Sequence, residues 1–369
     1  MQGELLIILV VATALAFDFT NGFHDTANVV ATSISTRALS PRLAVALAAL
    51  LNFAGAFISL KVAATIGSGI VVAAQITLPV VFAGLIGAIV WNLATWYFGL
   101  PSSSSHALIG GVIGAMLAAR GSGAVHFDGL LGKVVIPAVI SPLLAFAVAG
   151  CAIIVTYRLV ARLRPGPAAR GFRHGQILSG GMLALAHGTN DAQKTMGVIT
   201  LALIAHGDIS ASHFHVPVWV IVTAASAIAL GTYAGGWRII RTMGSRIIKM
   251  DPAQGFSAQS AGAAVVLAAS HVGFPLSTTH VMAGGVMGAG AGKRLSAVRW
   301  GVAGNMAIAW VLTLPAAAAV GAATYAVTSI FGGGLAGPAV VAALAILAVS
   351  GAMRRRARGL RAVPSGARP

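Results

Sequence analysis

Three carboxylates in this sequence lie inside long apolar runs, where an acidic side chain is least expected. The chain has 369 residues and only seven acidic ones, and apolar sequence surrounds Asp18, Asp25 and Asp191. If these runs cross a bilayer, each carboxylate costs roughly 2.5–3.5 kcal/mol on insertion scales, so its presence indicates a function. Asp25 and Asp191 recur in matching contexts and are assigned to function. Asp18 has Ala184 as its counterpart, so a hydrogen bond between helices explains it equally well.

The contexts of Asp25 and Asp191 form a repeated motif. The first copy reads Gly22-Phe23-His24-Asp25-Thr26-Ala27-Asn28, and the second, 166 residues later, reads Gly188-Thr189-Asn190-Asp191-Ala192-Gln193-Lys194. We expect each glycine to break its helix, because glycine weakens a helix interior. Unwound carbonyls and carboxylate oxygens suit a hard cation or a proton, and half-helix N-termini suit an anion. One site can therefore hold an anion beside its coupling cation.

A second repeated motif is rich in hydroxyl groups. It reads Gly99-Leu100-Pro101-Ser102-Ser103-Ser104-Ser105-His106 and, 174 residues later, Gly273-Phe274-Pro275-Leu276-Ser277-Thr278-Thr279-His280. Each proline is expected to end an incoming helix, so that the hydroxyls lie where the next helix begins. Hydroxyl and amide donors at two helix N-termini suit a tetrahedral oxyanion, whereas helix capping explains the same residues without a ligand. The candidate anion ligands are Ser103, Ser104, Ser105, Ser277, Thr278 and Thr279.

The elements that carry these motifs are predicted to be membrane-spanning helices. Hydrophobic residues make up 57% of the chain and charged residues only 8%, whereas about a quarter of a soluble domain is charged. This excludes an ordinary cytosolic enzyme and a disordered scaffold. The apolar runs are too long and continuous for the alternating strands of a membrane barrel, so we expect an all-α polytopic membrane protein. The runs lie near residues 4–20, 43–60, 77–100, 107–119, 134–157, 177–206, 217–237, 261–272, 281–291, 301–328 and 335–353.

Two different motifs repeated in the same order indicate an internal duplication. We expect three spans and one re-entrant hairpin in each half, with the Ser/Thr-rich motifs at the hairpin tips and the halves in opposite orientation. Such inverted-topology repeats with broken helices are typical of secondary transporters, whose sites lie where the repeats meet. The expected units are a first repeat at 1–157, a basic cytoplasmic loop at 158–174, a second, inverted repeat at 175–331, an additional transmembrane helix at 332–353 and a basic cytoplasmic tail at 354–369.

The basic residues are clustered rather than spread. They number 24 against 7 acids, which gives a net charge of +17, with five between Arg158 and Arg173 and six from Arg354 onward. Clusters in a few short segments are the positive-inside pattern of membrane topology, and they attract anionic lipid headgroups. Membrane lipid is therefore an expected partner, and nucleic acid is not.

The two motifs also carry a resemblance. The segments at 22–28 and 188–194 are similar to the paired signatures of the inorganic phosphate transporter (Pit) family. Their residues most resemble those of the bacterial low-affinity phosphate permeases. The likeness extends to the Ser/Thr-His tips and spans both halves. It implies symport of inorganic phosphate across the plasma (bacterial inner) membrane, driven by protons or sodium, with neutral metal–phosphate complexes among the cargo. We expect no enzymatic activity, no resident cofactor and no protein-bound metal.

Two departures from the sodium-coupled pattern bear on the coupling ion. His24 stands where that pattern has Asn, and Lys194 stands where the second copy would repeat Asn28. An ammonium in place of a cation ligand would repel Na⁺, so we expect proton coupling by alternating access; the alternative is that Lys194 extends to the membrane interface. The expected coupling residues are His24, Asp25, Asn28, Asp191 and Lys194, and Asn28 and Asn190 join the hydroxyls as expected phosphate ligands.

Other functions remain as alternatives. A sodium-coupled phosphate symporter and a permease for sulfate or another oxyanion share the expected fold, although two carboxylates favour phosphate because phosphate can donate a hydrogen bond. An intramembrane hydrolase is disfavoured because the serines form a run and the motif is duplicated, whereas a nucleophile needs one copy. A pore is a further alternative, and saturation kinetics would distinguish it from a carrier. The oligomeric state is open, with a homodimer among the alternatives.

Overall fold

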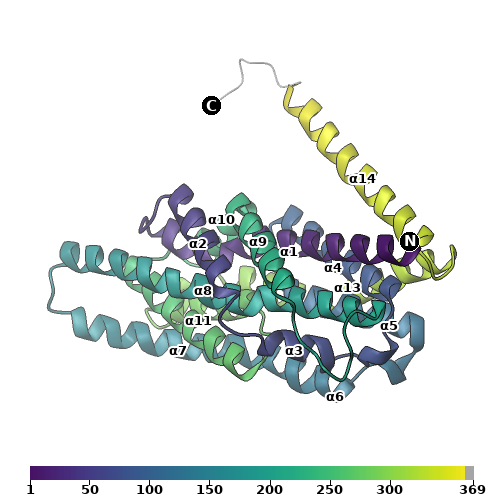
Figure 1. Ribbon diagram of the computed structural model, residues 1–369. Helices are drawn as coiled ribbons and strands as arrows, with labels where there is room; N and C mark the ends of the chain where they lie inside the picture. Colours follow the sequence, from purple (N-terminus) through teal and green to yellow (C-terminus); the bar gives the residue numbers. More distant parts are fainter. Residues whose placement is uncertain (362–369) are drawn as a thin grey trace.

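The computed structural model describes residues 1–361, and these residues are almost entirely helical (Figure 1). The part of the chain described contains no β-strand, only an isolated bridge between Val71 and Val125. The expected all-α class is confirmed. The predicted tail at 354–369 lies outside the residues whose side chains are described. The α-helices are α1 (Gln2–Ser35), α2 (Pro41–Gly55), α3 (Lys61–Ser68), α4 (Leu78–Phe98), α5 (Ser104–Arg120), α6 (Phe127–Leu130), α7 (Ile136–Val160), α8 (Pro165–His206), α9 (Val218–Ala234), α10 (Trp237–Arg241), α11 (Pro252–Val272), α12 (Thr278–Ala291), α13 (Trp300–Ser329) and α14 (Ala336–Arg361).

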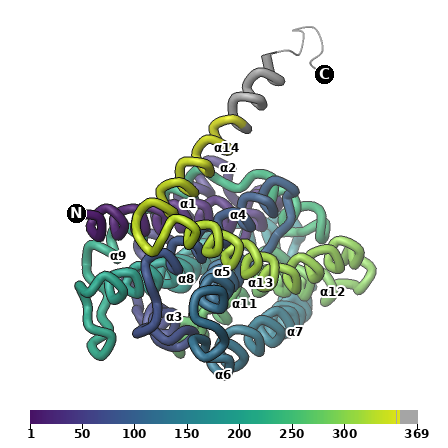
Figure 2. The backbone as a smooth tube through the Cα atoms, turned by 90° about the vertical axis from the view of Figure 1, so that its right-hand side faces the viewer, coloured from purple at the N-terminus to yellow at the C-terminus, as the bar shows by residue number. Residues whose placement is uncertain are grey.

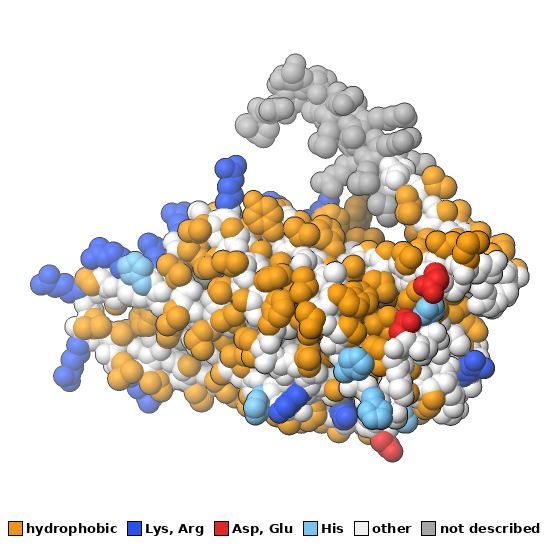
Figure 3. Space-filling view, viewed as in Figure 1, with side chains coloured by type: hydrophobic (Ala, Val, Ile, Leu, Met, Phe, Trp, Pro, Cys, Tyr) orange, Lys and Arg blue, Asp and Glu red, His pale blue; other side chains and the backbone are white. Residues whose placement is uncertain are grey.

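The surface and the helix lengths fit a membrane. Apolar side chains cover the middle of the molecule, and many Lys and Arg side chains gather at the end where α7 connects to α8 (Figure 3). Within the described residues, α8 does not qualify as an apolar span because polar side chains fill its middle, and these are buried. The helices long and apolar enough to cross a membrane are Gln2–Ser35, Leu78–Phe98, Phe127–Val160 and Trp300–Ser329, with a fifth if Val218–Ala234 and Trp237–Arg246, bent by 58°, act as one span.

Each Ser/Thr-rich motif connects two helices that pack side by side, α4 with α5 and α11 with α12. The first helix of each pair ends at a glycine in the left-handed conformation, Gly99 with φ +67° and Gly273 with φ +87°. A residue with a Cβ atom rarely adopts this conformation, so glycine allows the sharp reversal. The two hairpins are therefore where the motifs predict them, and their depth in the membrane stays a prediction.

The two halves of the chain are interlocked (Figures 1 and 2). Helix α2 packs on α8, and α9 packs on α1, so one helix of each half packs against the long central helix of the other half. Helix α7 packs on the α11–α12 hairpin, and α13 packs on the α4–α5 hairpin. The connection predicted at 158–174 is also mostly helical, since α7 ends at Val160 and α8 begins at Pro165, where proline suits the first turn.

The predicted helix breaks at Gly22 and Gly188 are wrong. Both α1 and α8 run without interruption through these positions. A Cβ atom on Gly22 would lie 2.4 Å from the carbonyl oxygen of Ile228, and one on Gly188 would lie 2.1 Å from that of Asn52. The glycines therefore serve close helix crossings, α1 with α9 and α8 with α2, and the helices keep their backbone hydrogen bonds.

The start of α11 is tied to its neighbours by one carboxylate. Asp251 caps α11 by accepting from the Gln254 amide at 2.9 Å, and it also accepts from the Tyr157 hydroxyl at 2.6 Å and the Lys293 ammonium at 3.0 Å. Burial acts to raise the pKa of Asp251, but these three hydrogen bonds outweigh it and hold the pKa below its ordinary value. The contacts join α7 to both ends of the second hairpin.

We predict that Gly188→Ala lowers stability by about 1–3 kcal/mol, because the new Cβ atom would meet the α2 backbone. Gly171→Ala is the matched control on the same helix, where the space around the glycine is open, and it should gain about 0.5–1 kcal/mol of helix stability. Denaturant unfolding of the purified protein in detergent measures both. Equal stability of the two variants would contradict the close crossing.

We also predict an acid-dependent contribution from Asp251. A carboxyl with a depressed folded-state pKa stabilises the fold above its unfolded-state pKa of about 3.9, and this stabilisation is lost as the pH falls through the lower folded-state value. Asp251→Asn should therefore unfold more easily than the wild type at pH 7, and the difference should shrink in acid. Thermal unfolding between neutral and acidic pH tests this, and a pH-independent difference would count against it.

Candidate substrate and ion site

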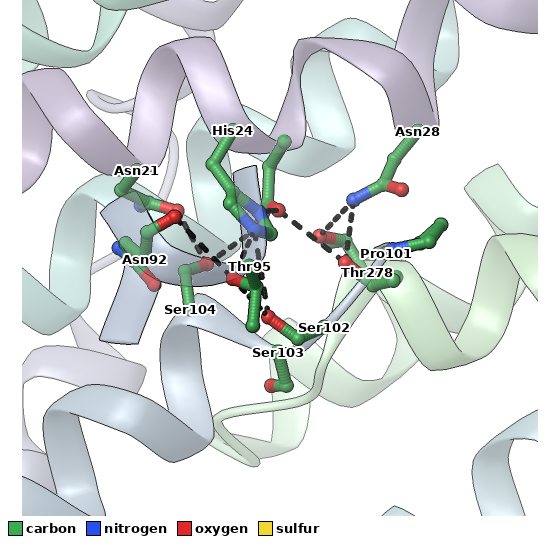
Figure 4. A network of polar contacts seen from close by, with 12 residues as sticks. Asn21, His24, Asn28, Asn92, Thr95, Pro101, Ser102, Ser103, Ser104 and Thr278 are labelled. Atoms are coloured by element: carbon green, nitrogen blue, oxygen red, sulfur yellow. Dashed lines mark hydrogen bonds and ion pairs between the residues drawn. The ribbon is translucent and has the colours of Figure 1, made fainter. Parts of the chain in front are cut away.

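The middle segments of α1 and α8 meet the tips of both hairpins in a buried polar cluster. Asp25, Asp191 and Lys194 are each at most 2% exposed. Figure 4 shows side chains from α1 reaching the connection between α4 and α5 and the start of α12. The cluster therefore draws on both halves of the chain, as the repeat pattern predicts for a site between repeats. The labelled residues of this view include Asn21, His24, Asn28, Thr95, Ser102, Ser104 and Thr278.

Asp25 is contacted by both hairpin tips. Ser104 at the first tip lies with Oγ 2.6 Å from Asp25 Oδ2, and Thr279 at the second lies with Oγ1 3.3 Å from Asp25 Oδ1. The Ser104 hydroxyl also lies 2.6 Å from Asn21 Oδ1, and since it has one proton it donates to one of these oxygens at a time. The neighbouring His24 places Nδ1 2.8 Å from Asp25 Oδ1. Three polar contacts therefore hold the Asp25 carboxylate in place.

His24 is positioned from its other side by hydroxyl groups. Its Nε2 lies 3.1 Å from Thr95 Oγ1 and 3.4 Å from Ser102 Oγ. An ionised Asp25 only accepts hydrogen bonds, so His24 Nδ1 donates to it in that state. Neutral His24 then uses Nε2 as an acceptor toward the hydroxyls, and protonated His24 donates on both sides. The ring can therefore carry a proton between Asp25 and the hairpin connection.

Lys194 lies inside the cluster, so the alternative that it extends to the membrane interface is wrong. Its ammonium forms an ion pair with Asp191 and donates to Ser105 Oγ at 2.5 Å and to the Leu276 carbonyl at 2.8 Å. An ammonium has three protons, and these three acceptors match them. The side chain is 1% exposed.

The contacts of the two halves correspond. Asp25 accepts from Ser104 of its own half, and Asp191 accepts at 3.3 Å from Thr278, the equivalent residue of the second motif. Each repeated carboxylate thus contacts the hairpin tip of its own half.

The residues three positions after the carboxylates reach across to the other half. Asn28 donates to Thr279 at 2.9 Å, and Lys194 donates to the equivalent Ser105 at 2.5 Å. The replacement of Asn by Lys keeps this crossed contact and adds a positive charge on one side only. The contacts of the cluster are therefore repeated between the two halves, whereas its charge is not.

Three functional candidates were missed or left undecided in the sequence. His187 Nε2 lies 3.0 Å from Asp191 Oδ2, and ligand atoms of Asp25, His187 and Asp191 all lie within 4.8 Å of one another. His187 and Asn21 both stand four residues before a repeated carboxylate, and this spacing places them on the same helix face. Asp18 is fully buried beside the cluster, and its Oδ2 has no hydrogen-bond partner among the described residues.

Three predicted ligands have structural partners instead. Ser103 and Ser277 are the N-caps of α5 and α12, and each accepts from the backbone amide three residues later. Asn190 donates to Ser270 at 2.8 Å and to the Phe274 carbonyl at 3.2 Å, which holds the end of α11. These three contacts position the tips rather than complete the cluster.

The two histidines after the tips lie apart from the polar cluster's hydrogen bonds. The rings of His106 and His280 meet edge to face, with their centroids 4.9 Å apart. Both line an otherwise apolar cavity of about 700 Å³ between α7, α12 and α13. This position among apolar side chains is that of core histidines.

The comparisons with known proteins agree with this geometry. A model of the phosphate transporter family matches residues 21–321. The chain belongs to this family. A probable low-affinity inorganic phosphate transporter of Mycobacterium tuberculosis (strain ATCC 25618 / H37Rv) is 55% identical over 328 residues, 89% of this chain and 79% of the relative. One from Bacillus subtilis (strain 168) is 45% identical over 325 residues, 87% and 96% of the two chains.

A solved structure is similar as well. It is titled "The sodium-dependent phosphate transporter", and it matches with a TM-score of 0.79 and 25% identity over 88% of this chain and 99% of that chain. The resemblance to the phosphate transporter family and its bacterial low-affinity members is therefore confirmed. The family is one of transporters, so the enzyme alternative is excluded. The apolar helices and the bacterial relatives place the protein in the plasma membrane.

We predict strong energetic coupling between Asp191 and Lys194. Asp191→Asn leaves a buried ammonium without its counter-charge and should cost about 3–5 kcal/mol of stability. Asp191→Asn/Lys194→Gln removes both charges and should cost less than Asp191→Asn alone. Denaturant unfolding of the wild type, the two single variants and the double variant in detergent gives the coupling energy of the pair.

The same cycle at Asp251 and Lys293 is the control. That pair has the same chemistry, but Lys293 is 51% exposed, so we expect a coupling of about 0–1 kcal/mol. Equal coupling in the two cycles would mean that the ion pair of Asp191 is as solvated as the surface pair.

Proposed function

We propose that this protein imports inorganic phosphate by proton symport with alternating access. The observation that carries the proposal is the single buried cluster in which two repeated carboxylates, one ammonium and two hydroxyl-bearing tips meet. Hydroxyl and ammonium donors suit an oxyanion, and closely spaced carboxylates suit protons.

The proposed phosphate ligands are donors that can turn from protein acceptors to the anion. Ser104, Ser105, Thr278 and Thr279 stand at the starts of α5 and α12, where the helix dipole favours an anion. Lys194 adds the one full positive charge, and Asn28 adds an amide. Phosphate in a protonated form can also donate to a carboxylate, which sulfate at neutral pH cannot do.

The charges of the cluster support proton coupling. Ionised Asp25 and Asp191 would repel an entering phosphate. Protonation of Asp191 would remove one negative charge and release Lys194 for the anion, so protons and phosphate each strengthen the binding of the other. His24 is the proposed second proton carrier because it contacts Asp25 directly. Because these ionisable groups lie so close together, the uptake of a proton is a property of the whole cluster rather than of one residue.

Alternating access is supported by the duplicated contacts. Two similar hairpins approach one site from the two halves, so movement of either hairpin can open the cluster on its own side while the other stays closed. Transporters built from repeats commonly work in this way around a fixed site.

Sodium coupling is the second candidate, and two findings favour it. Ligand atoms of Asp25, His187 and Asp191 lie close enough together to hold one cation, and the similar solved structure is titled sodium-dependent. The ammonium of Lys194 at Asp191 weighs against it, because it already supplies a positive charge there. A neutral metal–phosphate complex is a further form in which the substrate can enter.

Uptake of radiolabelled phosphate into proteoliposomes tests the proposal. We expect wild-type uptake to rise with an inward proton gradient, to ignore a sodium gradient and to resist competition by sulfate. Lys194→Asn, which restores the residue type of the first copy, should lose at least about tenfold in proton-driven uptake, the equivalent of one charge-assisted hydrogen bond.

Lys61→Asn is the matched control, because Lys61 is exposed at the start of α3, and it should transport normally. Sodium-driven uptake by the wild type would replace proton coupling with the second candidate. Sulfate uptake without phosphate uptake would overturn the substrate, and unsaturable flux would indicate a pore.

A further inference from the structure

A second cationic pocket lies outside the buried cluster. It has a volume of about 360 Å³ and lies between the end of α4 and the segment that begins with α10. Arg238, Arg241 and Arg246 line it, and all three are exposed. Within the described residues none of the three forms an ion pair with a carboxylate, since the ion pairs there involve other bases. Three uncompensated guanidinium groups around one hollow attract an anion.

One of the arginines is already fixed to the rim. Arg238 donates to the carbonyl of Tyr97, and its guanidinium lies 5.0 Å from the centre of the Tyr97 ring and 5.7 Å from that of Trp96. Arg241 and Arg246 have no comparable contact among the described residues, so their donors are available to a ligand. A guanidinium offers paired N–H groups that match two oxygens of a phosphate group.

The rim of this pocket is linked to the buried cluster through the end of α4. Thr242 donates to the Gly99 carbonyl at 2.9 Å, and Gly99 is the left-handed residue that closes α4. Two neighbours in the chain contact His24: Thr95 lies one helical turn before Gly99, and Ser102 lies three residues after it. A ligand that tightens the segment from Trp237 to Arg246 against Gly99 would therefore act on the connection that holds His24.

We propose that this pocket is a second anion site, which binds a phosphate group and thereby stabilises the α4–α5 connection. The group comes either from free phosphate or from the phosphate of a lipid headgroup, since both present the same oxygens to the arginines. Basic pockets between transmembrane helices are known to bind lipid headgroups. The Trp237 side chain at the rim suits a position at the membrane surface. The site is separate from the cluster proposed for transport.

Direct binding is the first test, and it does not depend on the transport proposal. The full chain in a neutral detergent is titrated with sn-glycerol 3-phosphate by calorimetry. Arg241→Gln/Arg246→Gln should weaken binding by roughly tenfold or more. The matched control is Arg170→Gln/Arg173→Gln, which removes the same charge from exposed positions on α8 and should bind as the wild type does. No binding by the wild type, or equal binding by both double variants, would overturn the site.

Uptake in vesicles of two compositions identifies the source of the phosphate group, and this arm rests on the proposed transport of phosphate. If a lipid occupies the pocket, adding phosphatidic acid to phosphatidylcholine vesicles should raise wild-type uptake and leave Arg241→Gln/Arg246→Gln unchanged. If free phosphate occupies it, the same variant should raise the KM for phosphate in phosphatidylcholine alone, and phosphatidic acid should inhibit the wild type.

A variant that matches the control in both vesicles would remove the proposed link to the α4–α5 connection. Uptake lost equally in the wild type and all variants, with binding intact, would instead count against the transport proposal alone.

Discussion

The buried ammonium of Lys194 is the constraint on which the centre of this structure depends. A charge removed from water must be compensated by nearby groups or it destabilises the fold. Its partners come from three places: Asp191 on its own helix, Ser105 at the first hairpin tip and the Leu276 carbonyl at the second. Satisfying one charge therefore brings both hairpins to the same point on α8. The same requirement makes the cluster sensitive to any ion that competes for these partners.

Close helix packing supplies the narrow space in which this cluster forms. Glycines at the crossings leave no room for a Cβ atom, as at Gly114 against the Ala318 carbonyl and at Gly288 against that of Phe146. The small-residue runs after each tip thus hold α5 on α13 and α12 on α7. Because the scaffold is tight, polar side chains inside it must contact one another, and an entering anion has to exchange contacts rather than fill empty space.

The end of α4 connects the two anion-attracting regions of the molecule. Its residue Thr95 contacts His24 in the buried cluster, and its terminal residues form one wall of the arginine pocket. The contact with His24 and the surface charge are thus separated by about one helical turn of a rigid element. A helix end that is held at both places is the rigid element through which the proposed link between them would act.

The sequence by itself determined the membrane-embedded all-α class, the family and the repeated motifs that carry Asp25, Asp191 and Lys194, because composition and local motifs carry that information. It did not determine that α1 and α8 pass unbroken through Gly22 and Gly188, since the same glycine permits either a break or a close crossing and only the neighbouring helix decides. The exchange of helices between the halves, the capping role of Ser103 and the placement of His187 at Asp191 were likewise decided by tertiary structure. Each of these depends on contacts with residues distant in the chain, and a motif read along the sequence does not contain its partner.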